Sequence, residues 1–300
     1  MTASNLPPDE SPLRPRGRPA GGAHLDSTAQ LMNRITSQLG SQLSLVSLDG
    51  SRRPAPPALV LVAHGSRDPR APATVRTLME RVRELRPHLP VRLGHIELNE
   101  PLLPDTLASL GDAHAVLVPL LLSRGYHVKK DIPEAAAAAR AHTRVAAPLG
   151  PHPLLVETLY ARLVEAGWPA SMSEARRRAG AVVLAAAGSR DPASALDTRR
   201  TAQLLAERLG VPVVPAYASA AAPTVPQAVR ALAARGRHRV AVASYFTAPG
   251  RFHTECTEAA PWIAAAPLGD HAAMARLVLH RYDQALATPE AATEPALASA

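Results

Sequence analysis

The sequence predicts an α/β protein made of two similar halves, each with a mainly parallel sheet flanked by helices. Two observations carry this prediction. Short apolar runs alternate with helical stretches along most of the 300 residues, a pattern typical of βαβ units. The stretch ALVLVAHGSRD at 58–68 also returns as AVVLAAAGSRD at 181–191, and Pro-Leu-Gly at 148–150 returns at 267–269. Landmarks that recur in the same order at nearly constant separation indicate an internal duplication.

The first half is assigned to residues 58–167. Its short apolar runs predict strands at 58–63, 91–98 and 114–121, and the stretches between and after them predict helices at 70–86, 102–112, 132–142 and 152–166. Asp68 is the expected N-cap of the first helix, with Pro69 at its first position, and Asp131-Ile132-Pro133 opens a later one. Asn99-Glu100-Pro101 is a turn signal after the second strand.

The second half is assigned to residues 181–286 and repeats this order. Strands are predicted at 181–186, 211–217 and 239–245, and helices at 193–209, 224–235 and 271–286. A histidine stands two residues past each Pro-Leu-Gly, His152 in one half and His271 in the other, ahead of the last helix. A linker that contains Arg176-Arg177-Arg178 joins the two halves.

The two ends of the chain are expected to lie outside the duplicated part. Residues 1–57 form an N-terminal extension, rich in Pro, Gly, Arg and Ser at its start and expected to be disordered there. Within it an amphipathic helix is predicted at 25–46, where apolar residues recur every fourth position: Leu31, Ile35, Leu39 and Leu43. Residues 287–300 read as a disordered tail.

Composition limits the classes of function. The chain carries 33 Lys and Arg against 25 Asp and Glu, a net charge of +8 that favours an acidic ligand. No dense basic run suits nucleic acid; the nearest, at 176–178 and 235–239, are expected to be solvated loop charge. Aromatic residues make up only 3%, too few for base-stacking surfaces. A single cysteine, Cys256, excludes an internal disulfide and a CxxC metal site.

Membrane and secretory signals are also missing from the pattern. No apolar stretch is long enough to span a bilayer, and the first residues lack the apolar core of a secretory signal. We therefore expect a cytoplasmic protein with no membrane partner.

Three side chains that can bind a metal follow the first three predicted strands. His64 follows the first and Glu97 ends the second, while His127 comes after the third, where Gly125 permits an unusual backbone angle. Carboxyl ends of parallel strands meet at one edge of a sheet, so we expect these side chains at one rim. Two imidazoles and a carboxylate suit a borderline divalent ion with positions left open for exchange. Each alone also fits a turn or a solvated surface. His95, on the strand face of Glu97, is a further candidate ligand or proton acceptor.

The motifs around these residues are His-Gly-Ser-Arg after the first strand, Glu-Leu-x-Glu-Pro at the second, and Gly-Tyr-His-Val-x-x-Asp-Ile-Pro after the third. Together they resemble the sirohydrochlorin chelatases, the class II tetrapyrrole chelatases, over residues 58–286. The resemblance implies two tandem Rossmann-like halves facing each other across a cleft, the two-repeat long form of the family. His64, Glu97 and His127 would then be the catalytic and metal-binding residues.

The activity implied by the resemblance is ATP-independent insertion of Fe²⁺ or Co²⁺ into sirohydrochlorin, in siroheme or cobalamin biosynthesis. The metal is then a substrate, and no other cofactor is expected. Sirohydrochlorin is a polycarboxylate, so the cleft should present hydrogen-bond donors. The candidates, each of which also fits a solvated surface role, are Ser66, Arg67, Arg124, Lys129, Lys130, Arg190 and Arg251.

The second half differs from the first at the three ligand positions. Aligned by the repeated landmarks, the replacements are Ala187 for His64, Ser219 for Glu97, and His253 one residue past the position of His127. Two of the three ligand types are missing and the third is displaced. We therefore expect the second half to form the opposite wall of the cleft and to bind the macrocycle without holding the metal.

Two other functions compete with this interpretation. A non-catalytic carrier of metal or tetrapyrrole would use the same ligands. A histidine-dependent phosphohydrolase would need Arg before the histidine, where this chain has Ala63. The sequence leaves iron and cobalt open, although abundant Ala, Arg and Pro slightly favour siroheme synthesis. A monomer is expected because one chain already carries both halves.

Overall fold

The computed structural model describes residues 55–288. The helix predicted at 25–46 and most of the tail predicted at 287–300 lie outside these residues. Both predicted halves fall within one compact unit that begins at Pro56. No helix within the described residues is both long enough and apolar enough to cross a membrane.

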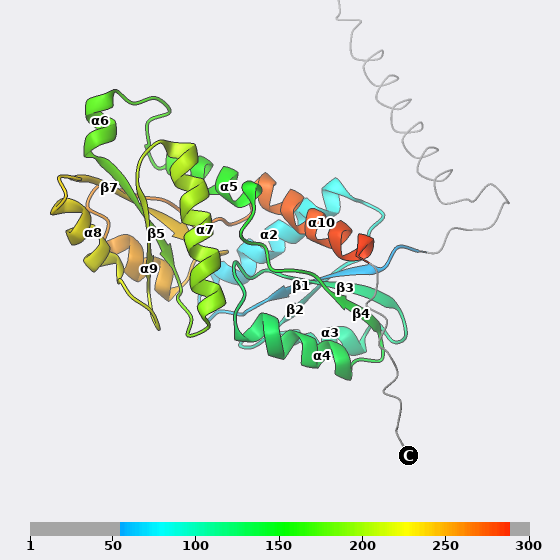
Figure 1. Ribbon diagram of the computed structural model, residues 1–300. Coiled ribbons are helices and arrows are strands. Elements are labelled where there is room, and N and C mark those ends of the chain that lie inside the picture. Colours follow the sequence, from blue (N-terminus) through cyan, green and yellow to red (C-terminus); the bar gives the residue numbers. More distant parts are fainter. Residues whose placement is uncertain (1–54, 289–300) are drawn as a thin grey trace, which may run out of the picture. The chain divides into compact units, whose positions relative to one another are not determined.

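A four-stranded parallel sheet forms the centre of the first half (Figure 1). Its strand order is β2-β1-β3-β4. The strands are β1 (Ala58–Ala63), β2 (Val91–His95), β3 (His114–Pro119) and β4 (His142–Val145). Every residue of β1 is buried, which is typical of an inner strand covered on both faces. Leu59 of β1 pairs with Val91 on one side and with Val116 on the other.

The second half repeats this sheet. Its strand order is β6-β5-β7-β8, again parallel, and the fully buried β5 takes the place of β1. The strands are β5 (Gly180–Ala186), β6 (Val213–Tyr217), β7 (Arg239–Tyr245) and β8 (Ile263–Ala264). The predicted α/β class and the predicted duplication are confirmed.

Helices connect the strands in both halves. Those of the first half are α2 (Arg70–Leu85), α3 (Leu103–Ala108), a short π-helical turn η1 (His127–Asp131), α4 (Ile132–Ala138) and α5 (Pro153–Glu165). The later ones are α6 (Glu174–Ala179), α7 (Pro192–Leu209), α8 (Val225–Ala233), α9 (Arg251–Glu258) and α10 (Ala272–Ala287). At the start of α2, Asp68 Oδ1 accepts from the Arg70 N–H, but the N-cap is Pro69 and not Asp68 as predicted, because the helix begins at Arg70. His152 and His271, which were not predicted to be caps, are the N-caps of α5 and α10 and accept backbone N–H groups through their Nδ1 atoms.

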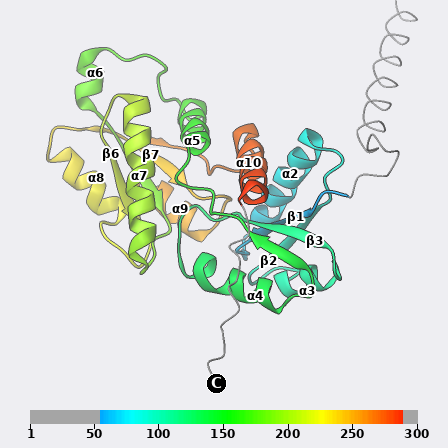
Figure 2. The ribbon, with the colours of Figure 1, turned by 45° about the vertical axis from the view of Figure 1, so that its right-hand side comes forward.

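The last helix of each half packs on the other half. Helix α5 contacts α7 and β7, whereas α10 contacts α2, β3 and β4, as Figures 1 and 2 show from two sides. One apolar cluster consequently runs through both halves. Leu155 of α5 and Leu277 of α10 are fully buried in it, and burial of a leucine side chain contributes about 1.5–3 kcal/mol. Because each half covers part of the other with its last helix, the two halves share one apolar core.

Several predicted boundaries were wrong. The helix predicted at 132–142 ends at Ala138, because Ala139 is extended. His142 already belongs to β4, where it pairs with His114 of β3. The run of alanines favours a helix and gives no sign of this short edge strand. The strand predicted at 91–98 ends at His95.

The predicted linker contains a helix. The arginines at 176–178 are exposed, as expected, but they lie in α6 and not in a loop. Ser173 caps this helix, and Glu174 contacts Arg177 and Arg178. Helix α9 was not predicted, although its first residue, Arg251, belongs to the candidate substrate-binding set.

Candidate metal and substrate site

A pocket of about 1440 Å³ lies at the carboxyl ends of the strands and is lined by residues of both halves. His64 follows β1, Glu97 lies two residues beyond β2, and His127 begins η1 after β3. All three line this pocket, as predicted from the positions of the strand ends.

The turn after β1 packs closely against the turn after β2 and is hydrogen-bonded to it. Gly65 has φ 104°, and a Cβ atom there would overlap the carbonyl oxygen of Glu97, so this position needs glycine. The Glu97 N–H donates to the His64 carbonyl oxygen at 3.0 Å, and the Ser66 N–H donates to Asn99 Oδ1 at 2.7 Å. These contacts fix the backbone of His64 beside that of Glu97.

His64 lies close to both of the other predicted ligands, Glu97 and His127. Its Nδ1 lies 3.5 Å from Glu97 Oε1, and its ring lies 4.7 Å from the ring of His127, edge to face at 90°. His64 and Glu97 remain about half exposed toward the pocket, with side-chain exposures of 45% and 51%. Within residues 55–288, no group of three or more His, Cys, Asp or Glu side chains is placed to hold a metal ion, and this includes the three predicted ligands. The structure brings His64 close to each of the other two but does not assemble all three as one ligand group.

Asp131 is a partner of His127 that the sequence did not reveal. Its Oδ2 lies 2.5 Å from His127 Nδ1, across the single turn of η1. This contact engages one ring nitrogen and leaves Nε2 for a ligand, as carboxylates commonly do for metal-binding histidines. The pattern His-x-x-x-Asp on a helical turn is the signal in the sequence for this pair.

His95 lies at the end of β2, opposite Ala63, and lines the pocket. It is only 3% exposed, and its Nδ1 lies 3.2 Å from the Pro101 carbonyl oxygen. Its Nε2 is buried and has no hydrogen-bond partner among the described residues. Burial lowers the pKa of His95, which favours the neutral ring.

The candidate substrate-binding residues fall into two groups. Arg67 and Arg190 line the pocket, are exposed, and occupy the same position in the two repeats. Neither makes a hydrogen bond or ion pair within the described chain. Lys130 and Arg251 also line it, near Glu134 at 3.9 Å and Glu255 at 3.2 Å. Ser66 is there too, its Oγ accepting from the Asp68 N–H.

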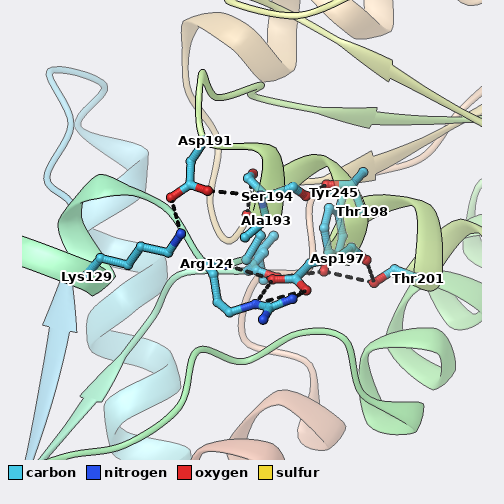
Figure 3. Close-up of polar contacts among 11 residues, drawn as sticks. Arg124, Lys129, Asp191, Ala193, Ser194, Asp197, Thr198, Thr201 and Tyr245 are labelled. Atoms are coloured by element: carbon cyan, nitrogen blue, oxygen red, sulfur yellow. Dashed lines mark hydrogen bonds and ion pairs between the residues drawn. The ribbon is translucent and has the colours of Figure 1, made fainter.

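Arg124 and Lys129 are engaged across the two halves (Figure 3). Arg124 is absent from the pocket lining, and its guanidinium pairs with Asp197 at 2.6 Å. Lys129 lines the pocket, but its Nζ lies 2.5 Å from Asp191 Oδ2. The structure therefore gives these two cations protein partners, in contrast to Arg67.

The sheet registers locate the replacements in the second half. Ala63 pairs with His95, and Ala186 pairs with Tyr217, which places Ser219 at the position of Glu97. The β1–β3 and β5–β7 registers place Phe252 at the position of His127 and His253 one residue later. Both ring nitrogens of His253 are buried without a hydrogen-bond partner in the described chain, and burial lowers its pKa.

The chain is similar in sequence to one known family and to several characterised relatives. The sequence pattern of the CbiX family matches residues 58–166 and again 181–285. The sirohydrochlorin ferrochelatase of Bacillus subtilis is 31% identical over 178 residues, 55% of this chain and 64% of the relative. The sirohydrochlorin cobaltochelatase of Methanococcus aeolicus is 38% identical over 80 residues, 26% of this chain and 56% of the relative. The chain thus spans little more than half the length of the cobaltochelatases that it matches.

Solved structures share the fold. The sirohydrochlorin chelatase SirB from Bacillus subtilis subspecies spizizenii in complex with cobalt has a TM-score of 0.62 and 22% identity, covering 78% of this chain and 96% of that one. SirB from Bacillus subtilis with Fe³⁺ has a TM-score of 0.60 and 23% identity, covering 77% and 95%. With two family repeats that together cover more than half of its length, the chain belongs to the CbiX family.

Proposed function

We propose that this protein inserts a divalent metal, iron or cobalt, into sirohydrochlorin without ATP. The observation that carries the proposal is the contact of His64 with both Glu97 and His127 at the wall of a large two-sided pocket. The ferrochelatase and cobaltochelatase relatives support the same reaction.

The chemistry of insertion suits these side chains. The macrocycle loses two N–H protons while the ion exchanges its protein ligands for the ring nitrogens. The imidazoles of His64 and His127 can bind the ion, and an imidazole can also accept a proton from the macrocycle. The carboxylate of Glu97 offsets the positive charge of the ion. A site built from these three side chains would leave positions on the ion open for the ring nitrogens.

The macrocycle would occupy the space between the metal side chains and the second half. The pocket of about 1440 Å³ exceeds the roughly 300–1,000 Å³ typical of sites for smaller ligands. Arg67 and Arg190 face it from the two halves, and their planar guanidinium groups can bind carboxylates in bidentate fashion. Lys130 and Arg251 add positive charge at the same pocket.

The test is a turnover experiment with purified protein, sirohydrochlorin and either Fe²⁺ or Co²⁺, followed by the visible spectrum of the macrocycle. We expect insertion well above the spontaneous rate for at least one metal, and loss of that excess in His64→Ala. The ratio of the two rates identifies the preferred metal. Binding of sirohydrochlorin with no rate above the spontaneous one would overturn the proposal and assign the chain as a carrier. The cytoplasmic location and the monomeric state stay predictions.

A further inference from the structure

Two carboxylates of the second half hold the loop that carries His127. Asp197 of α7 is 3% exposed, and its Oδ2 accepts from the Arg124 backbone N–H at 2.9 Å. The Arg124 guanidinium donates to the same carboxylate at 2.6 and 3.0 Å. Asp191, the N-cap of α7, pairs with Lys129, and this ammonium holds the pKa of Asp191 below its ordinary value.

Neutral contacts complete this attachment, which Figure 3 shows around α7. Ser123 Oγ lies 2.8 Å from Ser194 Oγ, and the Tyr245 hydroxyl donates to the Leu122 carbonyl oxygen at 2.9 Å. The Tyr245 hydroxyl also lies 3.2 Å from Thr201 Oγ1. The attached residues 122, 123, 124 and 129 flank His127 on both sides in sequence. We call these contacts the α7 clamp.

Among the described residues, the repeat-related side of the interface has no such clamp. The sheet registers and the repeated GSRD motif put Thr74 at the position of Asp197, and Pro249 at that of Arg124. Within the described chain, no hydrogen bond or ion pair joins residues 246–253 to α2. The polar attachment therefore occurs on the side where the metal-binding histidine lies and not on the side where Phe252 replaces it.

We propose that Asp197 and Asp191 are positioning residues, which act through Arg124 and Lys129 to keep His127 beside His64. The inference rests on the proposed function and deepens it, because it gives the half without metal ligands a part in metal binding. Charge-assisted hydrogen bonds are short and directional, and a bidentate arginine pair adds geometric specificity. A metal site needs such support, since ligands held loosely by about 1 Å lose much of their function.

The experiment measures Co²⁺ affinity by calorimetry, without sirohydrochlorin, in Asp197→Asn and Asp191→Asn. We expect Co²⁺ affinity to fall about tenfold or more in Asp197→Asn, by analogy with the loss of groups that orient metal ligands. In turnover assays kcat should fall while KM for sirohydrochlorin stays near the wild-type value. Asp283→Asn is a control for the loss of a bidentate arginine contact, because Asp283, although more exposed than Asp197, also receives one, from Arg86 at 2.6 and 2.9 Å.

A double-mutant cycle separates positioning from general support of the fold. If Asp197 acts through His127, then Asp197→Asn causes no further loss of Co²⁺ affinity in a His127→Ala background. Additive losses, or wild-type affinity in folded Asp197→Asn, would overturn the proposal. Should Asp197→Asn fail to fold, Asp191→Asn decides by the same cycle, since its carboxylate lies nearer the surface. If the wild-type protein binds Co²⁺ but does not insert it, the proposed function is wrong. The role of the α7 clamp in Co²⁺ binding is then still tested by the double-mutant cycle.

Discussion

Replacement of Gly65 by alanine tests how the metal side chains are positioned. Gly65 has φ 104°, a conformation that costs a residue with a side chain about 1–3 kcal/mol. The new Cβ atom would also overlap the carbonyl oxygen of Glu97, a backbone atom that cannot rotate away. If the turn shifts instead, the 3.0 Å hydrogen bond from the Glu97 N–H to His64 is lost. We therefore expect a destabilisation of about 3–5 kcal/mol, at the upper end for single substitutions.

Gly188 provides the matched control, because the second half repeats this turn. It has φ 91°, and its added Cβ would overlap the carbonyl oxygen of Ser219 in the same way. Gly188→Ala should cost similar stability but leave Co²⁺ affinity unchanged in the folded protein, since Ala187 replaces the histidine there. Denaturation can be followed by fluorescence of Trp168 and Trp262, and Co²⁺ affinity by calorimetry. Equal loss of Co²⁺ affinity in both variants, or none in Gly65→Ala, would show that the Gly65 turn does not position the proposed metal ligands.

Three further predictions follow. Burial, chiefly, lowers the pKa of His152 from 6.5 to about 4, so the stability it lends the fold is present above pH 6.5 and is lost as pH falls toward 4. After discounting for solvent screening, we expect the free energy of unfolding to fall by about 1 kcal/mol over this pH range, as measured by denaturation at several pH values. This pH dependence should be smaller in His152→Asn, whose side chain still offers an acceptor for the helix cap. Arg67→Ala and Arg190→Ala should each raise KM for sirohydrochlorin about tenfold with unchanged Co²⁺ affinity, and unchanged KM would remove them from substrate binding. Asp131→Asn should weaken Co²⁺ binding about 10- to 100-fold, because it loses the charged partner of His127; wild-type affinity would contradict that role.

Much of the framework could be predicted from local patterns. The buried run of β1 and the Gly-Ser-Arg-Asp turn recur in β5 with the same backbone, so the duplication in sequence became a duplication in structure. The strand-end rule alone placed His64, Glu97 and His127 at one pocket.

The parts that could not be predicted depend on distant partners. Arg124 was a reasonable candidate for a substrate carboxylate, but its partner Asp197 lies 73 residues away and belongs to the other half. The exchange of α5 and α10 has the same origin, because an amphipathic helix does not specify which apolar surface it covers. The edge strands β4 and β8 were missed because two to four residues carry too little periodicity.

We infer that each chain has one metal site, carried by the first half. Calorimetric titration of the wild type and of His64→Ala with Co²⁺ measures this stoichiometry. We expect one ion per chain in the wild type and loss of that binding in His64→Ala. Two ions per chain, or undiminished binding in folded His64→Ala, would show that the first half does not carry a single metal site.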